Sequence, residues 1–271
     1  MSVDDTEKPA SLWQPDLVVA VTQGDISAQW HVPEEAPVAL IYNGLTFAVM
    51  LASPMDLTDF ITGFSLTEGI VGTPDDILGV EQHERRQGID LHMTISAKCF
   101  ERLKLRQNRR SMEGRTSCGL CGIDSAERLF ESLPRVAEHR KVLDSKVVAK
   151  AAAALETMQP LKQLNKSVHG AAFVADDGAV TLVREDVGRH NALDKLIGAM
   201  AREGRDTHGA GRGAGFVLVT SRASFEMVEK AARSGAQALV ALSAPTGFAI
   251  RRAAEANMTL ANFSRGVLTV F

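Results

Sequence analysis

Residues 216–263 read FVLVTSRASFEMVEKAARSGAQALVALSAPTGFAIRRAAEANMTLANF, and this stretch decides the fold. It repeats one unit: an apolar run with the length of a buried strand, a loop that contains hydroxyl side chains, and a segment with the apolar spacing of a helix. Residues 180–202 show the same unit. Strands that alternate with helices predict a mostly parallel sheet with helices on both faces, so the expected class is α/β.

This α/β domain is expected to span residues 124–271. Its predicted strands are 171–175, 180–184, 216–220, 238–242 and 258–263, with 267–271 as a further edge strand. Its predicted helices are 124–133, 145–158, 190–202, 224–233 and 247–256. Pro134 and Pro160 are expected to end the first two of these helices.

The N-terminal part reads differently. Residues 1–11 are polar and are predicted to be a disordered tail. Residues 12–110 are predicted to form a β-rich subdomain with one amphipathic helix that begins after Asp56 and closes at Gly69. Its predicted strands are 17–21, 38–42, 46–51, 77–81 and 89–95.

Polar and basic residues recur in the loops that follow the predicted strands of the α/β domain. In open α/β sheets, ligands bind beyond the carboxyl ends of the strands. Hydroxyls and guanidinium groups at helix N-termini suit an anion such as a phosphate. The alternative is that each hydroxyl only caps its helix. The candidate residues are Asp186, Arg189, His190, Thr220, Ser221, Arg222, Ser243, Thr246, Ser264 and Arg265.

Two thiols, Cys118 and Cys121, lie three positions apart in a glycine-rich segment. We expect residues 111–123 to form a mobile loop, and a helix directly after it would favour the thiolate. Residues 98–115 carry seven basic and two acidic residues, which also lowers a thiol pKa and attracts anions. We interpret this basic stretch as one helical turn that runs into the loop; the alternative is an ordinary solvated face.

Composition and charge narrow the classes of function and location that the protein can have. The net charge of −3 gives no nucleic-acid signal, and no apolar run approaches the length that a membrane helix needs. The N-terminus lacks the apolar segment of a secretory signal, so we expect a cytoplasmic protein without membrane attachment. The glycine-rich residues 209–215 lack the ending of a phosphate-binding P-loop.

Zinc is the alternative use of the thiols. It would need Cys99 and one further ligand among His83, His92, His139 and His169. Their spacing does not support such a site, so no metal is expected. Cys99 follows an apolar run and is expected to be a buried small side chain.

Several motifs along the chain resemble those of the FdhD/NarQ family of formate dehydrogenase accessory sulfurtransferases. The longest, VREDVGRHNALDK at residues 183–195, is far more specific than a lone pair of cysteines. The others are TEGI at 67–70, SCGLCG at 117–122, TSRASFEMVEKA at 220–231, SAPT at 243–246 and NFSRG at 262–266.

The resemblance implies a sulfur carrier. It would take persulfide sulfur from a cysteine desulfurase and pass it to the molybdenum bis(guanylyl) cofactor, molybdenum bis(molybdopterin guanine dinucleotide), of formate dehydrogenase. The persulfide maps to Cys118, with Cys121 as its partner. The resemblance also implies a cytidine deaminase-like C-terminal fold without the zinc motif, and a cytoplasmic homodimer. The cofactor-binding segment maps to Phe263, Ser264, Arg265, Gly266, Val267 and Leu268.

Two other functions stay open at this point. A chaperone that binds the cofactor without moving sulfur would need the arginine loops and not the thiols. A dithiol oxidoreductase would form a Cys118–Cys121 disulfide and retain no sulfane sulfur.

Overall fold

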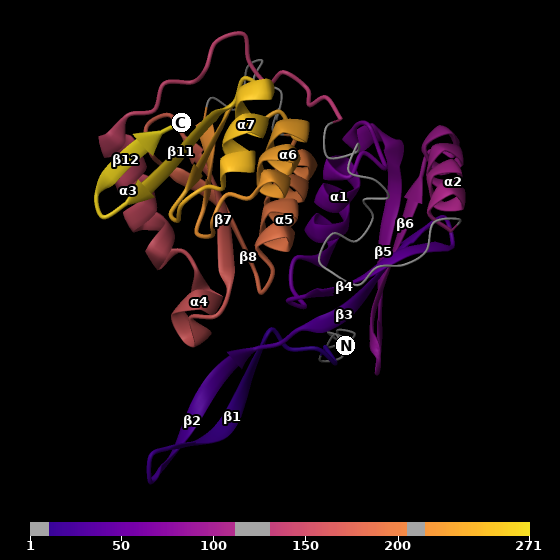
Figure 1. Ribbon diagram of the computed structural model, residues 1–271. Coiled ribbons are helices and arrows are strands. Elements are labelled where there is room, and N and C mark those ends of the chain that lie inside the picture. The colour runs from indigo at the N-terminus through magenta and orange to yellow at the C-terminus, as the bar shows by residue number, and fades with distance from the viewer. Residues whose placement is uncertain (1–10, 112–130, 205–214) are drawn as a thin grey trace, which may run out of the picture.

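The computed structural model describes residues 11–111, 131–204 and 215–271. Within them, two α/β units lie side by side, and a long β-hairpin projects below both (Figure 1). The expected α/β class with a β-rich N-terminal part is confirmed.

The C-terminal unit is built on a six-stranded sheet in the order β12-β11-β10-β9-β7-β8. The three central strands β9 (Gly215–Val219), β10 (Ala238–Ala241) and β11 (Thr259–Ser264) are parallel, as expected. The flanking strands β7 (His169–Ala175), β8 (Val180–Asp186) and β12 (Val267–Val270) each pair antiparallel with their neighbours. The sheet is therefore mixed, because β7 and β8 form a hairpin that inserts β7 next to β9.

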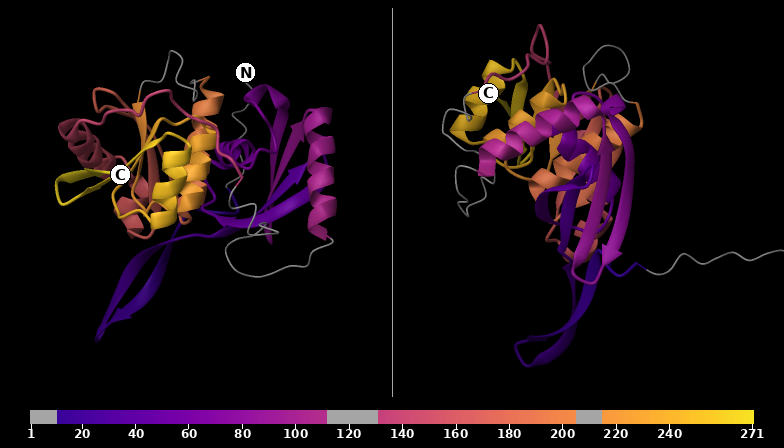
Figure 2. Two further views of the ribbon diagram at one scale, coloured as in Figure 1. Left: turned by 45° about the horizontal axis from the view of Figure 1, so that its top comes forward. Right: turned by 90° about the vertical axis from the view of Figure 1, so that its right-hand side faces the viewer.

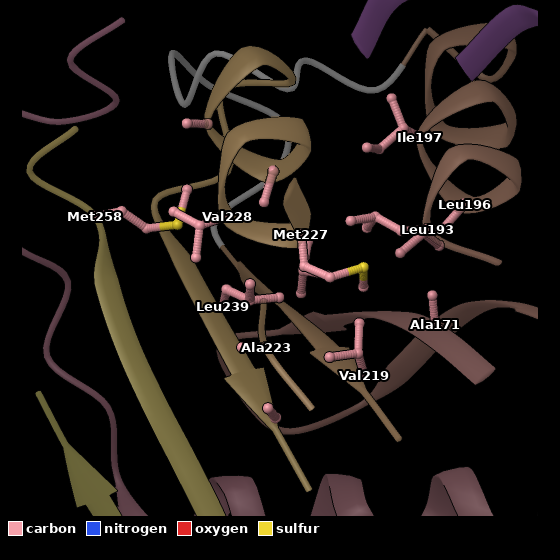
Figure 3. Close-up of a cluster of buried hydrophobic side chains, with 14 of the residues drawn as sticks. Ala171, Leu193, Leu196, Ile197, Val219, Ala223, Met227, Val228, Leu239 and Met258 are labelled. Carbon is pink, nitrogen blue, oxygen red and sulfur yellow. The ribbon is translucent and has the colours of Figure 1, made fainter. Parts of the chain in front are cut away.

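Helices cover both faces of this sheet. On one face, α5 (Arg189–Arg202), α6 (Phe225–Arg233) and α7 (Gly247–Glu255) bury their apolar sides against the strands. Figure 3 shows Met227 and Leu193 from these helices over Val219 and Ala171 of the sheet. On the other face lies α3 (Ser145–Thr157). Alternate strand residues enter the two cores, which explains why these strands are continuously apolar in sequence.

The N-terminal unit has a four-stranded sheet in the order β4-β3-β6-β5. The strands are β3 (Ala36–Tyr42), β4 (Leu45–Ala52), β5 (Ile77–Arg85) and β6 (Gly88–Ile95), and the 3-10 turn η1 (Pro74–Asp76) precedes β5. Helices α1 (Leu57–Thr67) and α2 (Ala97–Ser111) share one core with this sheet.

The two units are joined where α1 crosses α5. At the crossing, a Cβ added to Gly63 would lie 1.7 Å from the carbonyl oxygen of Asp194. A Cβ added to Gly198 would lie 1.9 Å from the carbonyl oxygen of Asp59. Two glycines thus allow the helix backbones to touch, which fixes the N-terminal unit against the C-terminal sheet.

The projecting hairpin consists of β1 (Asp16–Gln23) and β2 (Ile26–Pro33). The short helix α4 (Pro160–Asn165) packs beside β2. Figure 2 shows the hairpin extending away from both sheets in two further views.

Several sequence expectations need correction. The described part of the basic stretch, residues 98–111, lies in the 15-residue helix α2 and is not a single turn. Pro160 begins α4, whereas α3 already ends at Thr157. Strand β2 was not predicted, because its apolar residues alternate with serine, glutamine and histidine. The predicted helix 124–133 falls mostly outside the described residues, and its described end, 131–133, is not helical. Most of the predicted tail (1–11) and of the thiol loop (111–123) also lies outside them.

Candidate functional site

The predicted polar loops meet at one edge of the C-terminal sheet. His169 at the start of β7 pairs with Asp186 at the end of β8, and Ala171 pairs with Val219 at the end of β9. Because β9, β10 and β11 are parallel, their carboxyl ends lie at this same edge. It is the lower end of the sheet in Figure 1, where α4 leads into β7. The loops after β8, β9, β10 and β11 therefore converge, as the strand–helix alternation predicts.

Two of the predicted hydroxyls at this edge have local structural roles. Thr246 is the N-cap of α7, and its hydroxyl accepts a hydrogen bond from the Ala249 amide at 3.2 Å. Ser221 is 5% exposed and its hydroxyl donates to the Arg222 carbonyl at 3.0 Å. The capping alternative thus describes Thr246, whereas Ser221 makes a local hydrogen bond and does not cap a helix. Ser221 is buried, whereas Thr246 is an exposed residue.

Ser224 behaves differently. It is the N-cap of α6, yet its side chain makes no capping hydrogen bond. Its buried hydroxyl oxygen has no hydrogen-bond partner among the described residues. The first turn of α6 thus keeps amide donors that a bound anion can use.

The segment Phe263–Leu268 divides into an inner and an outer part. Phe263 and Leu268 lie opposite each other in register and pack against the α3-side core. Arg265 and Gly266 form the turn between β11 and β12 with φ angles of 51° and 77°. Both residues of this turn lie in the left-handed region, as the tight turns of β-hairpins require. The Arg265 guanidinium is thereby carried on an exposed hairpin tip.

Arg189 and His190 begin α5 directly after its N-cap, Gly188. Burial lowers the pKa of His190 to about 4, and the neighbouring Arg189 charge adds to this effect. The imidazole is therefore neutral near pH 7. Its Nε2 atom is buried, has no hydrogen-bond partner among the described residues, and lies 3.9 Å from a carboxylate oxygen of Glu226.

His169 is a residue of this edge that the sequence suggested only as a zinc ligand. It is the first residue of β7, and burial lowers its pKa, with further lowering by the Arg189 and Lys162 charges. Lys162, on α4, reaches the edge because the Glu185 carboxylate accepts the amides of Leu161 and Lys162, both at 3.0 Å. A second positive charge near His169 is therefore contributed by α4, a helix that the sequence did not predict.

Several residues of the block at 183–195 face inward, toward the interface between the two units. Lys195 and Asp186 are both fully buried and form an ion pair of 2.6 Å. Lys195 also donates to the Ser53 carbonyl at 2.9 Å, and Asp186 accepts the Ser53 amide at 3.0 Å. Asn191 donates to the Leu51 carbonyl at 2.8 Å and to Asp186 at 3.0 Å. These residues bind the end of β4 to the start of α5.

A second buried ion cluster links three of the sequence motifs. Lys230 of α6 lies 2.9 Å from Glu68 and 3.0 Å from Asp194. The Thr67 hydroxyl donates to Asp194 at 2.7 Å. Burial raises the pKa of Asp194 to about 6, although Lys230 opposes this, and the pKa of Lys230 is raised by its carboxylate neighbours against the effect of burial. TEGI, the long block and the SRASFEMVEKA motif thus meet in one cluster.

The basic helix α2 supplies fewer free charges than its sequence suggests. Arg102 donates to the Ile70 carbonyl at 3.1 Å, and Arg106 donates to the carbonyls of Glu68 at 3.1 Å and Gly69 at 3.3 Å. These arginines satisfy carbonyls at the C-terminal end of α1. Lys104 pairs with Glu101 at 2.6 Å. These basic side chains of α2 therefore stabilise the N-terminal unit through local contacts.

Cys99 is 2% exposed and packs in the N-terminal core, as expected. The sulfur-bearing candidates Cys118 and Cys121 lie outside the described residues. Within the described parts of the chain, no three histidine, cysteine or acidic side chains gather as a possible metal site. In the same parts, no helix is long and apolar enough to cross a membrane.

The fold and the converging loops define an α/β protein with polar and basic residues gathered at one edge of its C-terminal sheet. A model of the FdhD/NarQ family matches residues 33–271, and the chain belongs to this family. The sulfur carrier protein FdhD of Cupriavidus necator is 50% identical over 235 residues, covering 87% of this chain and 79% of that protein. The protein of the same name from Xanthomonas campestris pv. campestris is 43% identical over 265 residues, covering 96% and 92%.

A crystal structure from Desulfotalea psychrophila, described as a putative formate dehydrogenase accessory protein, has the same fold. It superimposes with a TM-score of 0.69 at 21% identity and covers 94% of this chain and 95% of that one.

Proposed function

We propose that this protein carries sulfur as a persulfide on Cys118 and delivers it to the molybdenum bis(guanylyl) cofactor of formate dehydrogenase. A cysteine desulfurase is the donor, and the reaction takes place in the cytoplasm. The observation that carries the proposal is the convergence of the loops after β8, β9, β10 and β11 at one sheet edge. The names of the relatives in the FdhD/NarQ family support the same role.

The sheet edge is suited to the nucleotide part of the client cofactor. Arg189, Arg222 and Arg265 come from three different loops of the edge, and guanidinium groups match the geometry of phosphate oxygens. The first turns of α5 and α6 lack side-chain caps, so their amides remain available as donors. A cofactor with two guanine nucleotides carries the phosphates that such an edge requires.

The thiols perform the transfer in this proposal. The Cys118 thiolate attacks the outer sulfur of the donor's persulfide, and the donor's cysteine leaves as a thiolate. One sulfur–sulfur bond breaks and one forms, so no outside oxidant or reductant enters this step. Cys121 assists Cys118 or receives the sulfur from it.

Intact-protein mass spectrometry after incubation with a cysteine desulfurase and cysteine tests the carrier role. We expect the wild-type protein to gain one sulfur atom that reductant removes, and Cys118→Ala to gain none. Cys99→Ala is the matched control, because this thiol is buried in the N-terminal core and should not affect loading. Full loading of Cys118→Ala would contradict the proposal. No loading of any variant, with guanine-nucleotide binding retained, would favour the chaperone alternative.

A further inference from the structure

Three polar side chains gather at the starts of α5 and α6, two helices that lie side by side (Figure 1). Ser224 is the N-cap of α6 and Glu226 follows it by two residues, while His190 lies in the first turn of α5. The Glu226 carboxylate is 3.9 Å from His190 Nε2, which is beyond hydrogen-bond distance. We call His190, Ser224 and Glu226 the α5–α6 group.

Two members of the α5–α6 group have unused hydrogen-bonding atoms. In the described parts of the chain, buried side-chain polar atoms without a hydrogen-bond partner occur only on His190, Ser224 and Gln159. Such atoms are rare in native structures, and each one requires an explanation. Capping does not explain Ser224, because its hydroxyl makes no capping hydrogen bond to α6. The side chains of His190 and Glu226 are 30% and 29% exposed, so a ligand from solvent can reach the group.

The charges around the α5–α6 group select against an ion. A phosphate between these side chains would be repelled by Glu226, so phosphates belong with the arginines of the edge. Burial and then the charges of Arg189 and Lys230 lower the pKa of His190, although Glu226 and Glu68 oppose them. These surroundings therefore also disfavour an added positive charge. The group suits a neutral ligand that donates hydrogen bonds to a carboxylate.

An aromatic pair lies directly beside the α5–α6 group. Phe225 stands between Ser224 and Glu226 in the chain, and its ring is 5.0 Å from the ring of Phe248 on α7. Both phenylalanines are partly exposed. Aromatic side chains offer flat apolar faces that pack well against a planar ring. A flat apolar flank next to a carboxylate fits a planar heterocycle with neighbouring N–H groups.

We propose that the α5–α6 group binds the pterin of the client cofactor through its 2-amino-4-oxopyrimidine edge, an assignment that rests on the proposed function. Glu226 accepts two hydrogen bonds, one from the ring N–H and one from the 2-amino group, and a charged acceptor strengthens both. The 4-oxo oxygen accepts a hydrogen bond from the Ser224 hydroxyl or from neutral His190. Guanine presents the same edge, so position along the sheet must separate the two heterocycles.

The strand order places the α5–α6 group away from the arginine turn between β11 and β12. Along the order β11-β10-β9-β7-β8, α6 starts after β9 and α5 starts after β8. With about 4.8 Å between neighbouring strands, these starts lie roughly 10 Å and roughly 19 Å from the turn. A diphosphate and a ribose separate the pterin from the guanine in each dinucleotide. With the nucleotide at the Arg265 turn, the pterin requires such a second subsite on the same edge.

Fluorescence titration with 6-hydroxymethylpterin tests this proposal, because oxidised pterins are themselves fluorescent. The test variant is Glu226→Gln, which keeps the shape of the side chain and removes its charge. The matched control is Glu156→Gln, which makes the same change at an exposed residue of α3, on the other face of the sheet. Lumazine is the control ligand, since it has an oxo group in place of the 2-amino group. Thermal unfolding checks that both variants fold.

We expect the wild type and Glu156→Gln to bind the pterin equally and to bind lumazine more weakly. Glu226→Gln should bind the pterin roughly 10- to 100-fold more weakly, as expected for loss of a charged hydrogen-bond acceptor. Absence of pterin binding in the wild type, or equal affinities of Glu226→Gln and Glu156→Gln, would overturn the proposal. If Glu226→Gln fails to fold, Ser224→Ala replaces it. This variant removes a hydroxyl without a protein partner, so its melting temperature should not fall while pterin affinity drops roughly 5-fold.

A parallel titration with guanosine diphosphate identifies which heterocycle the group binds. We expect Glu226→Gln to retain guanosine diphosphate affinity. Loss of that affinity with pterin binding unchanged would assign the group to guanine and overturn the pterin assignment. Sulfur loading of Cys118, measured by mass spectrometry, is independent of these titrations. Failure of the carrier role would therefore leave a measured pterin affinity in place, and loss of the pterin site would leave loading intact.

Discussion

The interface between the two units and the edge of the C-terminal sheet use the same types of residue in opposite ways. At the interface, Lys195 and Asp186 are fully buried, and each has several hydrogen-bond partners. At the sheet edge, Arg222 and Arg265 are exposed. Buried charges are tolerated only when they are paired and hydrogen-bonded. The interface charges therefore hold the structure together, whereas the two edge arginines remain exposed to solvent.

One sequence block serves both regions. In VREDVGRHNALDK, Asp186, Asn191, Asp194 and Lys195 face the interface, while Arg189 and His190 lie at the edge. Arg189 and His190 lie in the first turn of α5, and Asp194 and Lys195 lie in its second turn. A long motif in a sequence is thus not evidence that all its residues touch a ligand. Substitutions in the two groups should separate stability from binding.

The largest effect is expected from Lys195→Met. This change leaves the Asp186 carboxylate buried without its cation, which should lower the free energy of unfolding by about 3–5 kcal/mol. Urea denaturation followed by circular dichroism measures the loss. The double variant Asp186→Asn with Lys195→Met removes both charges and should lose less than the single variant. If the single variant is as stable as the wild type, the pair does not stabilise the interface.

Gly198→Ala should have the next largest effect. The added methyl group would lie 1.9 Å from the Asp59 carbonyl oxygen, so α1 and α5 must move apart. We expect a loss of about 3 kcal/mol from such overpacking. Gly79→Ala is the control, since its Cβ would have no neighbour within 4 Å. Equal stabilities of the two variants would show that the helix crossing adapts to the methyl group.

The sequence predicted the elements better than their contacts. Helices α5, α6 and α7 and strands β9 to β11 follow from local apolar periodicity and lie where expected, within a few residues. The convergence of the loops follows from parallel strands alone. The insertion of β7 beside β9 is a long-range pairing that no local pattern encodes.

The buried ion clusters could not have been predicted for a similar reason. Thr67 and Asp194 are separated by 127 positions, and Lys230 and Thr67 by 163. In sequence, Lys230 and Arg106 look like solvated helix charges. The three-dimensional structure shows that Lys230 is buried and that Arg106 donates to the carbonyls of Glu68 and Gly69, just after α1. The sequence could identify the candidate site residues, but it could not separate those proposed to bind a ligand from those that stabilise the fold.

A smaller, pH-dependent effect is expected from His190. Its pKa is lowered to about 4 in the folded protein from the usual 6.5, so the folded state resists protonation. Stability from this group is complete above pH 6.5 and is lost as the pH falls toward 4, by about 2 kcal/mol after allowance for its partial exposure. His190→Gln should lack this loss when melting temperatures are compared between pH 7 and pH 4.5.

Asp194 provides the control for that experiment, because its shift has the opposite sign. Its pKa is raised to about 6 from 3.8, so its ionisation on raising the pH from 4 to 6 costs stability. In the wild type, the opposite effects of His190 and Asp194 on the pH dependence of stability partly cancel. His190→Gln retains Asp194, whose contribution to stability falls as the pH rises. Asp194→Asn retains His190, whose contribution rises with pH. The two variants should therefore show slopes of stability against pH that differ in sign. Identical slopes would mean that neither group is buried as described.

The smallest effect on stability, and the sharpest test of the sheet edge, is expected from Arg265→Asn. Arg265 adopts a φ angle of 51° before Gly266, a turn for which Asn-Gly is the preferred sequence. Asparagine should therefore keep the turn and leave the melting temperature equal or slightly higher, while the guanidinium is lost. We expect weaker binding of a guanine nucleotide in calorimetry, and a smaller dependence of that binding on salt. Unchanged affinity at unchanged stability would place the phosphates away from the β11–β12 turn, and leave Arg189 and Arg222 as the arginines of the edge to test next.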